Sequence, residues 1–155
     1  MRMRDHGIDI DVPRGWDGEI YRRSAGIEMQ GGGEARANPV VHLSNFPLPA
    51  ERGDFGSGAV EIMRTDSIFI ALCEFDRESA GKALFSTSGI PRVRPEDFAP
   101  HQMQRPIQGQ SGVQYFFNHG GRAFCLYVAL GGHVHRHELV PELNQVLSTL
   151  ILDEA

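Results

Sequence analysis

The last third of the chain constrains the fold most, because strand patterns there are followed by an amphipathic helix pattern. Gln114–Phe117 and Ala123–Leu130 have the composition of strands, and the turn residues Asn118–Gly121 between them predict a tight hairpin. From Glu138 to Leu152, apolar residues recur at helical spacing and form one stripe: Leu139, Leu143, Val146, Leu147 and Leu150. Pro141 is expected in the first turn of this helix, where its missing N–H costs nothing. The pattern predicts an α+β fold, an antiparallel sheet with a C-terminal helix packed on it.

The strand over Ala123–Leu130 also makes a prediction about which face the helix covers. Alternate side chains of a strand point to opposite faces. One face carries the larger set Phe124, Leu126, Val128 and Leu130, and the other carries Ala123, Cys125, Tyr127 and Ala129. We expect the helix on the face with the smaller side chains, where a second layer has more room.

Earlier segments supply further strands and one long loop. Ile8, Ile10 and Val12 alternate with polar residues, which is typical of a strand with one buried face. Ser67–Phe75 is apolar on both faces and predicts a central strand. Ser24–Asn38, with its triple glycine, is expected to be a loop, and no linker or repeat interrupts residues 1–155, so we expect one globular domain.

Charge and composition exclude several classes of function. The chain has 20 acidic and 15 basic residues and a net charge of -5, which argues against nucleic-acid binding. No apolar run approaches the ~20 residues of a spanning helix, and the first residues lack the apolar stretch of a secretory signal. We therefore expect a cytoplasmic protein without membrane insertion. Cys73 and Cys125 lie in apolar runs and are expected to be buried structural thiols.

Two segments together resemble a known family. They are IDVPRGW near the start, and GRAFCLYVALGG followed by LVPELNQVLSTLIL at the end. Their order is similar to that of the PsbP-like superfamily, which includes PsbP and LpqN-type proteins. The resemblance implies an α/β/α sandwich around an antiparallel sheet, and a role as a binding or assembly module rather than an enzyme. It implies no site residue, because the motifs that carry it are structural.

The sequence gives little support for a metal site. His133, His135 and His137 alternate, so an extended chain would present three imidazoles on one face. Arg136 stands among them and repels a cation, and no cysteine lies close in sequence, so we predict no metal site here. The carboxylates Asp9 and Asp11, and the set Glu74, Asp76 and Glu78, are typical of solvated strand faces. No phosphate-binding or nucleophile motif is present, and no catalytic residue or cofactor is predicted.

The irregular segment after Gly89 holds the candidate partner-binding residues. It combines the arginines Arg92, Arg94 and Arg105 with the apolar residues Phe98 and Met103. The apolar members either anchor a long loop to the core or form a protein-contact patch, and the sequence leaves both open. We expect a non-catalytic module that binds a protein partner, with self-association also compatible. The alternative is a small hydrolase or metal-dependent enzyme that uses the histidines or the surface carboxylates.

Overall fold

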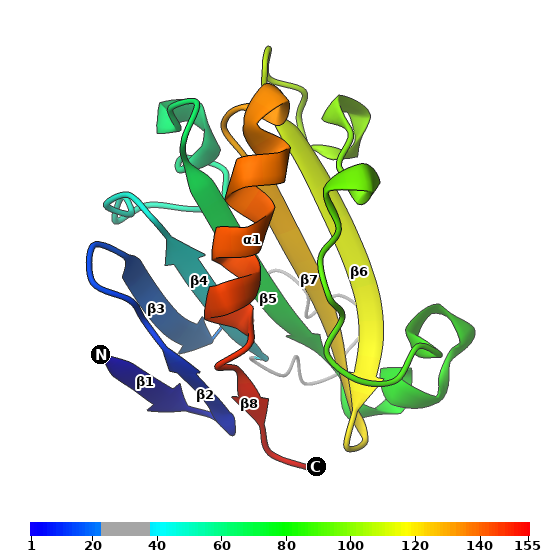
Figure 1. Ribbon diagram of the computed structural model, residues 1–155. Coiled ribbons are helices and arrows are strands. Elements are labelled where there is room, and N and C mark those ends of the chain that lie inside the picture. The colour runs from blue at the N-terminus through cyan, green and yellow to red at the C-terminus, as the bar shows by residue number, and fades with distance from the viewer. Residues whose placement is uncertain (23–37) are drawn as a thin grey trace.

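The computed structural model describes residues 1–22 and 38–155, which form two antiparallel sheets and a helix, α1 (Arg136–Leu147) (Figure 1). The larger sheet has the order β3-β4-β5-β7-β6, with the bounds Asp17–Arg22, Pro39–Ser44, Ile68–Phe75, Arg122–Leu130 and Ser111–His119. The smaller sheet has the order β1-β2-β8, with the bounds Arg2–Asp5, Ile8–Asp11 and Ile151–Leu152. Short 3-10 helices connect these elements: η1 Val60–Ile62, η2 Arg77–Gly81, η3 Ala83–Phe85, η4 Pro95–Asp97, η5 Pro100–Gln102 and η6 His133–His135.

The two central strands are those with the longest apolar runs. Every residue of β7 is buried, and β5 is buried from Ile68 to Glu74, because both faces of these strands are covered. Cys73 lies opposite Cys125 in their antiparallel register, and both thiols are buried. The hairpin from β6 to β7 turns at Gly120 and Gly121, whose φ angles of 55° and 82° suit glycine. The predicted central strands, buried thiols and hairpin are therefore confirmed.

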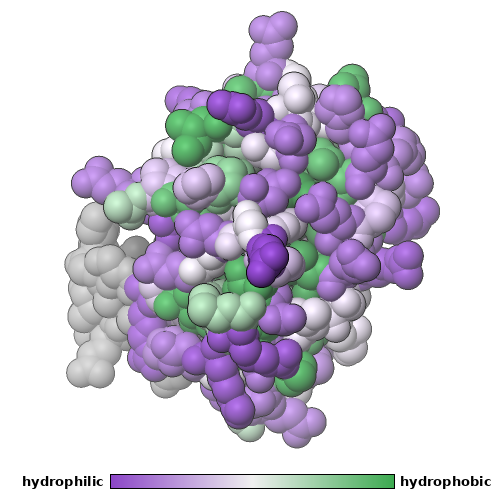
Figure 2. Space-filling model, turned by 60° about the vertical axis from the view of Figure 1, so that its left-hand side comes forward, coloured by the Kyte–Doolittle hydropathy of each residue, from purple (hydrophilic) through white to green (hydrophobic). Residues whose placement is uncertain are grey.

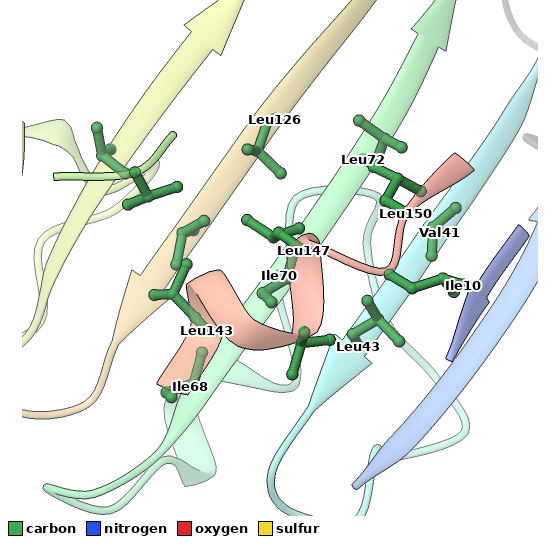
Figure 3. Close-up of a cluster of buried hydrophobic side chains, with 14 of the residues drawn as sticks. Ile10, Val41, Leu43, Ile68, Ile70, Leu72, Leu126, Leu143, Leu147 and Leu150 are labelled. Carbon is green, nitrogen blue, oxygen red and sulfur yellow. The ribbon is translucent and has the colours of Figure 1, made fainter. Parts of the chain in front are cut away.

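The helix covers the opposite face of the sheet from the one expected. Leu143 and Leu147 of α1 belong to one buried cluster with Leu126 and Ile70, and these side chains meet between helix and sheet (Figure 3). The large side chains of β7 thus interdigitate with the helix. On the small-residue face, Ala71 and Ala129 pack with residues from loops, such as Phe55 and Met103, which are long enough to fill the space. The prediction assumed that the helix packs where the side chains of the sheet leave most space. The helix instead packs on the face of β7 that has the larger apolar surface to bury.

The helix is shorter than the stripe of apolar residues suggested. It begins at Arg136 and ends at Leu147, and Ile151–Leu152 forms β8, which pairs with β2 through Leu152 opposite Ile8. Leu150 is still buried, so the apolar periodicity correctly indicated which residues are buried, even beyond the end of the helix. Pro141 lies in the second turn rather than the first, so the helix lacks the bond that an N–H at this position gives to His137.

Within residues 1–22 and 38–155, one layer of α-helix is present rather than two. Among the described residues α1 is the single α-helix, so the second helical layer implied by the α/β/α resemblance does not occur in this part of the chain. The fold that stands is α+β with antiparallel sheets and a C-terminal helix on one of them. The loop expected over Ser24–Asn38 falls almost entirely outside the described residues. Asn38 itself is described, and its Nδ2 donates to Asp76 Oδ1 at 2.9 Å.

A buried ion pair lies within the larger sheet, and its arginine also bonds to the smaller one. Arg122 at the start of β7 and Glu74 at the end of β5 are 2% and 4% exposed. The Arg122 Nε and Nη2 atoms donate to the two Glu74 oxygens at 3.0 and 2.7 Å. The remaining N–H groups donate to the carbonyls of His6, Gly7 and Asp153, so all five donors of the guanidinium are used. Glu74 was expected on a solvated face, and that expectation is wrong, because Arg122 compensates its burial.

Truncating the core face of the helix should destabilise the whole domain. Leu143 is fully buried, so Leu143→Ala is expected to lower the free energy of unfolding by about 2–5 kcal/mol. Leu84→Ala is the matched control, since Leu84 is 60% exposed and should change stability by less than about 0.5 kcal/mol. Chemical denaturation measures both. Equal effects of the two substitutions would contradict the packing of α1 on the sheet.

The two partners of the buried ion pair should contribute to stability as a coupled unit. Arg122→Met leaves the Glu74 carboxylate buried without its guanidinium, for an expected loss of about 3–5 kcal/mol. The double variant Glu74→Leu with Arg122→Met should be less destabilised than the sum of its single substitutions. Arg77 lies 3.6 Å from the same carboxylate but is half exposed, so Arg77→Met is the control, with a loss below about 1 kcal/mol. Additive single effects in the cycle would refute a coupled pair.

Candidate binding groove beside the helix

The chain segment before η4 is held against α1 by one side-chain amide. Asn144 of α1 accepts a hydrogen bond from the Val93 N–H at 3.2 Å and donates one to the Val93 carbonyl at 2.8 Å. The amide thereby satisfies both backbone groups of Val93, as a neighbouring strand would. The Val93 side chain is 1% exposed and belongs to the main core. A segment without regular secondary structure is thus fixed at its middle.

The other side of the same segment is fixed by β6. The hydroxyl of Tyr115 accepts a hydrogen bond from the Arg94 N–H at 3.2 Å and donates one to Asp97 Oδ2 at 2.7 Å. Burial, followed by the hydrogen bond to Asp97, raises the pKa of Tyr115 above that of a free phenol, which is already protonated at neutral pH. Further along, Ala99 and Gly112 exchange two backbone bonds of 3.1 Å. The segment is held from both sides.

A groove with a volume of about 700 Å³ runs between this segment and the second half of α1. Its floor is apolar and includes Ile90, Val140, Leu147 and Leu150. The helix side of the rim has the uncharged side chains of Gln145 and Ser148, whereas the segment side has Arg92 and Arg94. Of the described residues that line it, these two arginines are the charged ones. The groove therefore combines an apolar floor with positive charge on one wall.

The candidate partner-binding residues separate into three groups. Arg92 and Arg94 are exposed and line the groove. Phe98 and Met103 are 5% and 6% exposed and lie in the two core clusters, so they anchor the loop and offer no contact surface. Arg105 is exposed outside the groove and forms an ion pair with Glu61 at 3.0 Å. Of the two alternatives left open by the sequence, core anchoring is confirmed for Phe98 and Met103, and their assignment as partner-binding residues is wrong, because their side chains are buried.

The alternating histidines do not share one face. The strand ends at Leu130, His133–His135 form η6, and His137 lies in α1. His135 Nδ1 lies 3.3 Å from Glu138 Oε2, and Arg136 donates to the His133 carbonyl at 3.1 Å. In residues 1–22 and 38–155, no group of three or more His, Cys, Asp or Glu is arranged to hold a metal ion. Burial, and then the positive charge of Arg136, lower the pKa of His133.

The surface carboxylates considered for chemistry are engaged locally. Asp9 forms an ion pair with Arg2 at 2.6 Å, and Asp11 lies 3.4 Å from the N-terminal ammonium group. Asp76 accepts the hydrogen bond from Asn38. These three carboxylates line neither the groove nor the second cavity, of about 640 Å³, in which Glu74 lies with His6, Arg77 and Arg122. The contacts of Asp9 and Asp11 support their interpretation as part of a strand face.

A buried polar network on the helix-free face was missed at the sequence level. His42 of β4 is fully buried, and its Nε2 lies 2.8 Å from the Asp54 carbonyl. Its Nδ1 accepts a hydrogen bond from Arg52 Nε at 2.9 Å, which makes Nε2 the protonated nitrogen of a neutral ring. Tyr21 donates to Asp54 Oδ1 at 2.8 Å. The one available signal was a histidine inside the apolar run of residues 39–43, since a buried histidine needs partners.

This network is built for stability rather than catalysis. Both ring nitrogens of His42 are engaged within the protein and the ring has no exposed surface, so no substrate reaches it. Burial, together with the positive charge of Arg52, lowers the pKa of His42 to about 4. The groove beside α1 is consequently the candidate functional site.

Comparisons with known proteins add no assignment: no protein-family model matches the chain, and neither curated proteins nor solved structures gave a match. A search of the described residues for helices with the length and apolar character needed to cross a bilayer found none. Figure 2 shows a face of the molecule on which hydrophobic side chains are scattered among hydrophilic ones.

The buried histidine predicts a specific loss of stability in acid. The His42 pKa is about 4 in the folded protein and about 6.5 when unfolded, so the unfolded chain binds the proton more readily. The contribution of the neutral His42 ring to the free energy of unfolding is complete above pH 6.5. It is lost as the pH falls from 6.5 to 4, and the total loss is about 3 kcal/mol. Urea denaturation from pH 7 to pH 4 measures it. His42→Gln should flatten the slope in this range, and the exposed His137→Gln should retain it; an unchanged slope in His42→Gln would contradict the assignment.

Proposed function

We propose that this protein is a non-catalytic binding module, and that the groove between α1 and residues 90–95 receives an acidic segment of a partner protein. The observation that carries the proposal is the combination of apolar floor and two arginines in a rigid groove. An apolar floor supplies the area that binding buries, and the charged rim selects the partner. The chain as a whole is acidic, with a net charge of -5, so positive charge at this groove is a local feature.

Rigidity of the groove supports binding over catalysis. Asn144 and Tyr115 hold the segment from two sides, so little conformational entropy is lost when a partner binds. The lining residues include no nucleophile–base pair and no set of metal ligands among those described. The resemblance of the first and last segments to PsbP-like proteins supports the same class, since those are mostly binding or assembly modules. A cytoplasmic location and any self-association remain predictions from the sequence.

The alternative function is a small hydrolase or metal-dependent enzyme. The histidines at 133, 135 and 137 and the surface carboxylates are the residues it would use. Their separation onto η6, α1 and local ion pairs favours the binding module. Turnover of ester, phosphoester or peptide substrates by the purified protein would favour the enzyme instead.

Site-specific photo-crosslinking tests where the protein meets its partner. A benzophenone amino acid placed at Gln145, on the groove rim, is expected to capture a partner in cells of the native host. Gln108 is exposed outside the groove and is the matched control position. The crosslinked peptide of the partner, identified by mass spectrometry, should be acidic, and Arg92→Glu with Arg94→Glu should abolish its capture. Equal capture from both positions, or none from Gln145, would refute the proposed site.

A further inference from the structure

We infer that the groove recognises an extended segment in which two acidic side chains stand two residues apart with an apolar side chain between them. The inference rests on the proposed function and specifies the partner sequence that the same site takes. It follows from the spacing of Arg92 and Arg94, from the shape of the groove, and from the opposite character of its two sides.

The two arginines project from an extended piece of backbone. Arg94 has φ and ψ of -119° and 137°, and the Val93 side chain between the arginines is turned into the core. In an extended chain, residues two apart point to the same side and lie roughly 6.6 Å apart. Arg92 and Arg94 therefore leave the backbone on the same side, with Cα atoms at the repeat distance of an extended chain, and both side chains are exposed. Carboxylates two residues apart in an extended partner match this distance, whereas adjacent carboxylates point to opposite sides.

The alternation of an extended partner also matches the two sides of the groove. When its acidic side chains face the arginines, the residue between them points the other way, toward the helix side of the groove, where Val140 and Leu147 of α1 are among the lining residues. Arg94 lies 3.5 Å from Glu96 with both side chains more than half exposed, and a weak surface pair of this kind yields to an incoming carboxylate. The guanidinium can then bind the carboxylate through two parallel hydrogen bonds.

A helical partner with acids four residues apart offers a similar spacing, because four residues rise about 6 Å along a helix. An extended partner meets the arginines with one side and the apolar lining with the other, which favours the extended segment. Peptides with acids four apart test the helical alternative.

Binding of short synthetic peptides tests the spacing directly. The probes are fluorescein-labelled nine-residue peptides of Ser, Thr and Val that differ only in the placement of two Asp and one Leu. We expect the peptide with Asp-Leu-Asp at its centre to bind about tenfold more tightly than peptides with adjacent acids or with acids four apart. Asn-Leu-Asn should lose the binding. Fluorescence anisotropy gives each dissociation constant.

Matched variants separate specific recognition from general attraction. Arg92→Gln and Arg94→Gln should each remove the preference for Asp-Leu-Asp, while Arg105→Gln, which removes an exposed arginine outside the groove, should leave it unchanged. Equal binding of all acidic peptides, or tightest binding with acids four apart, would overturn the inferred spacing. If no peptide binds while the crosslink from Gln145 persists, the inference fails and the proposed function stands. If the crosslink is also absent, both fail.

Discussion

The buried guanidinium of Arg122 connects parts of the chain that lie more than 100 residues apart in sequence. It binds Glu74 of the neighbouring strand through two hydrogen bonds and reaches the carbonyls of His6, Gly7 and Asp153 with its other donors. These carbonyls belong to the turn between β1 and β2 and to the residue after β8, so one charge joins the small sheet to the large one. A charge in the interior is tolerated only when it is fully paired. This requirement holds the turn between β1 and β2 and the end of β8, which lie close together (Figure 1), against the start of β7.

The C-terminal helix both completes the core and forms one side of the groove. The buried side of α1 covers the large side chains of β5 and β7, and Asn144 on the same helix holds Val93 by its backbone. The groove is thus formed by the element that also completes the core, which explains its rigidity. A helix that ends at Leu147 also leaves the chain free to return as β8 beside β2, and so closes the small sheet.

The opposite face of the large sheet is organised differently, because no helix covers it in the described residues. Loop side chains such as Phe55 and Met103 fill the space above Ala71 and Ala129. His42, Tyr21, Arg52 and Asp54 satisfy one another there as a polar network. Such a network specifies loop positions through directional bonds, at the cost of sensitivity to acid where the buried imidazole must remain neutral.

Local pattern alone determined the central strands, the hairpin at Gly120–Gly121 and the buried stripe of α1, because alternation and helical periodicity follow from backbone geometry. It also singled out Arg92 and Arg94. The tertiary structure decided which face the helix covers, where the helix ends, and that Glu74, Phe98 and Met103 are buried. It likewise brought Asn144 to Val93 across 51 positions and assembled the network around His42. These outcomes depend on partners distant in sequence, whose pairing energy no single segment contains.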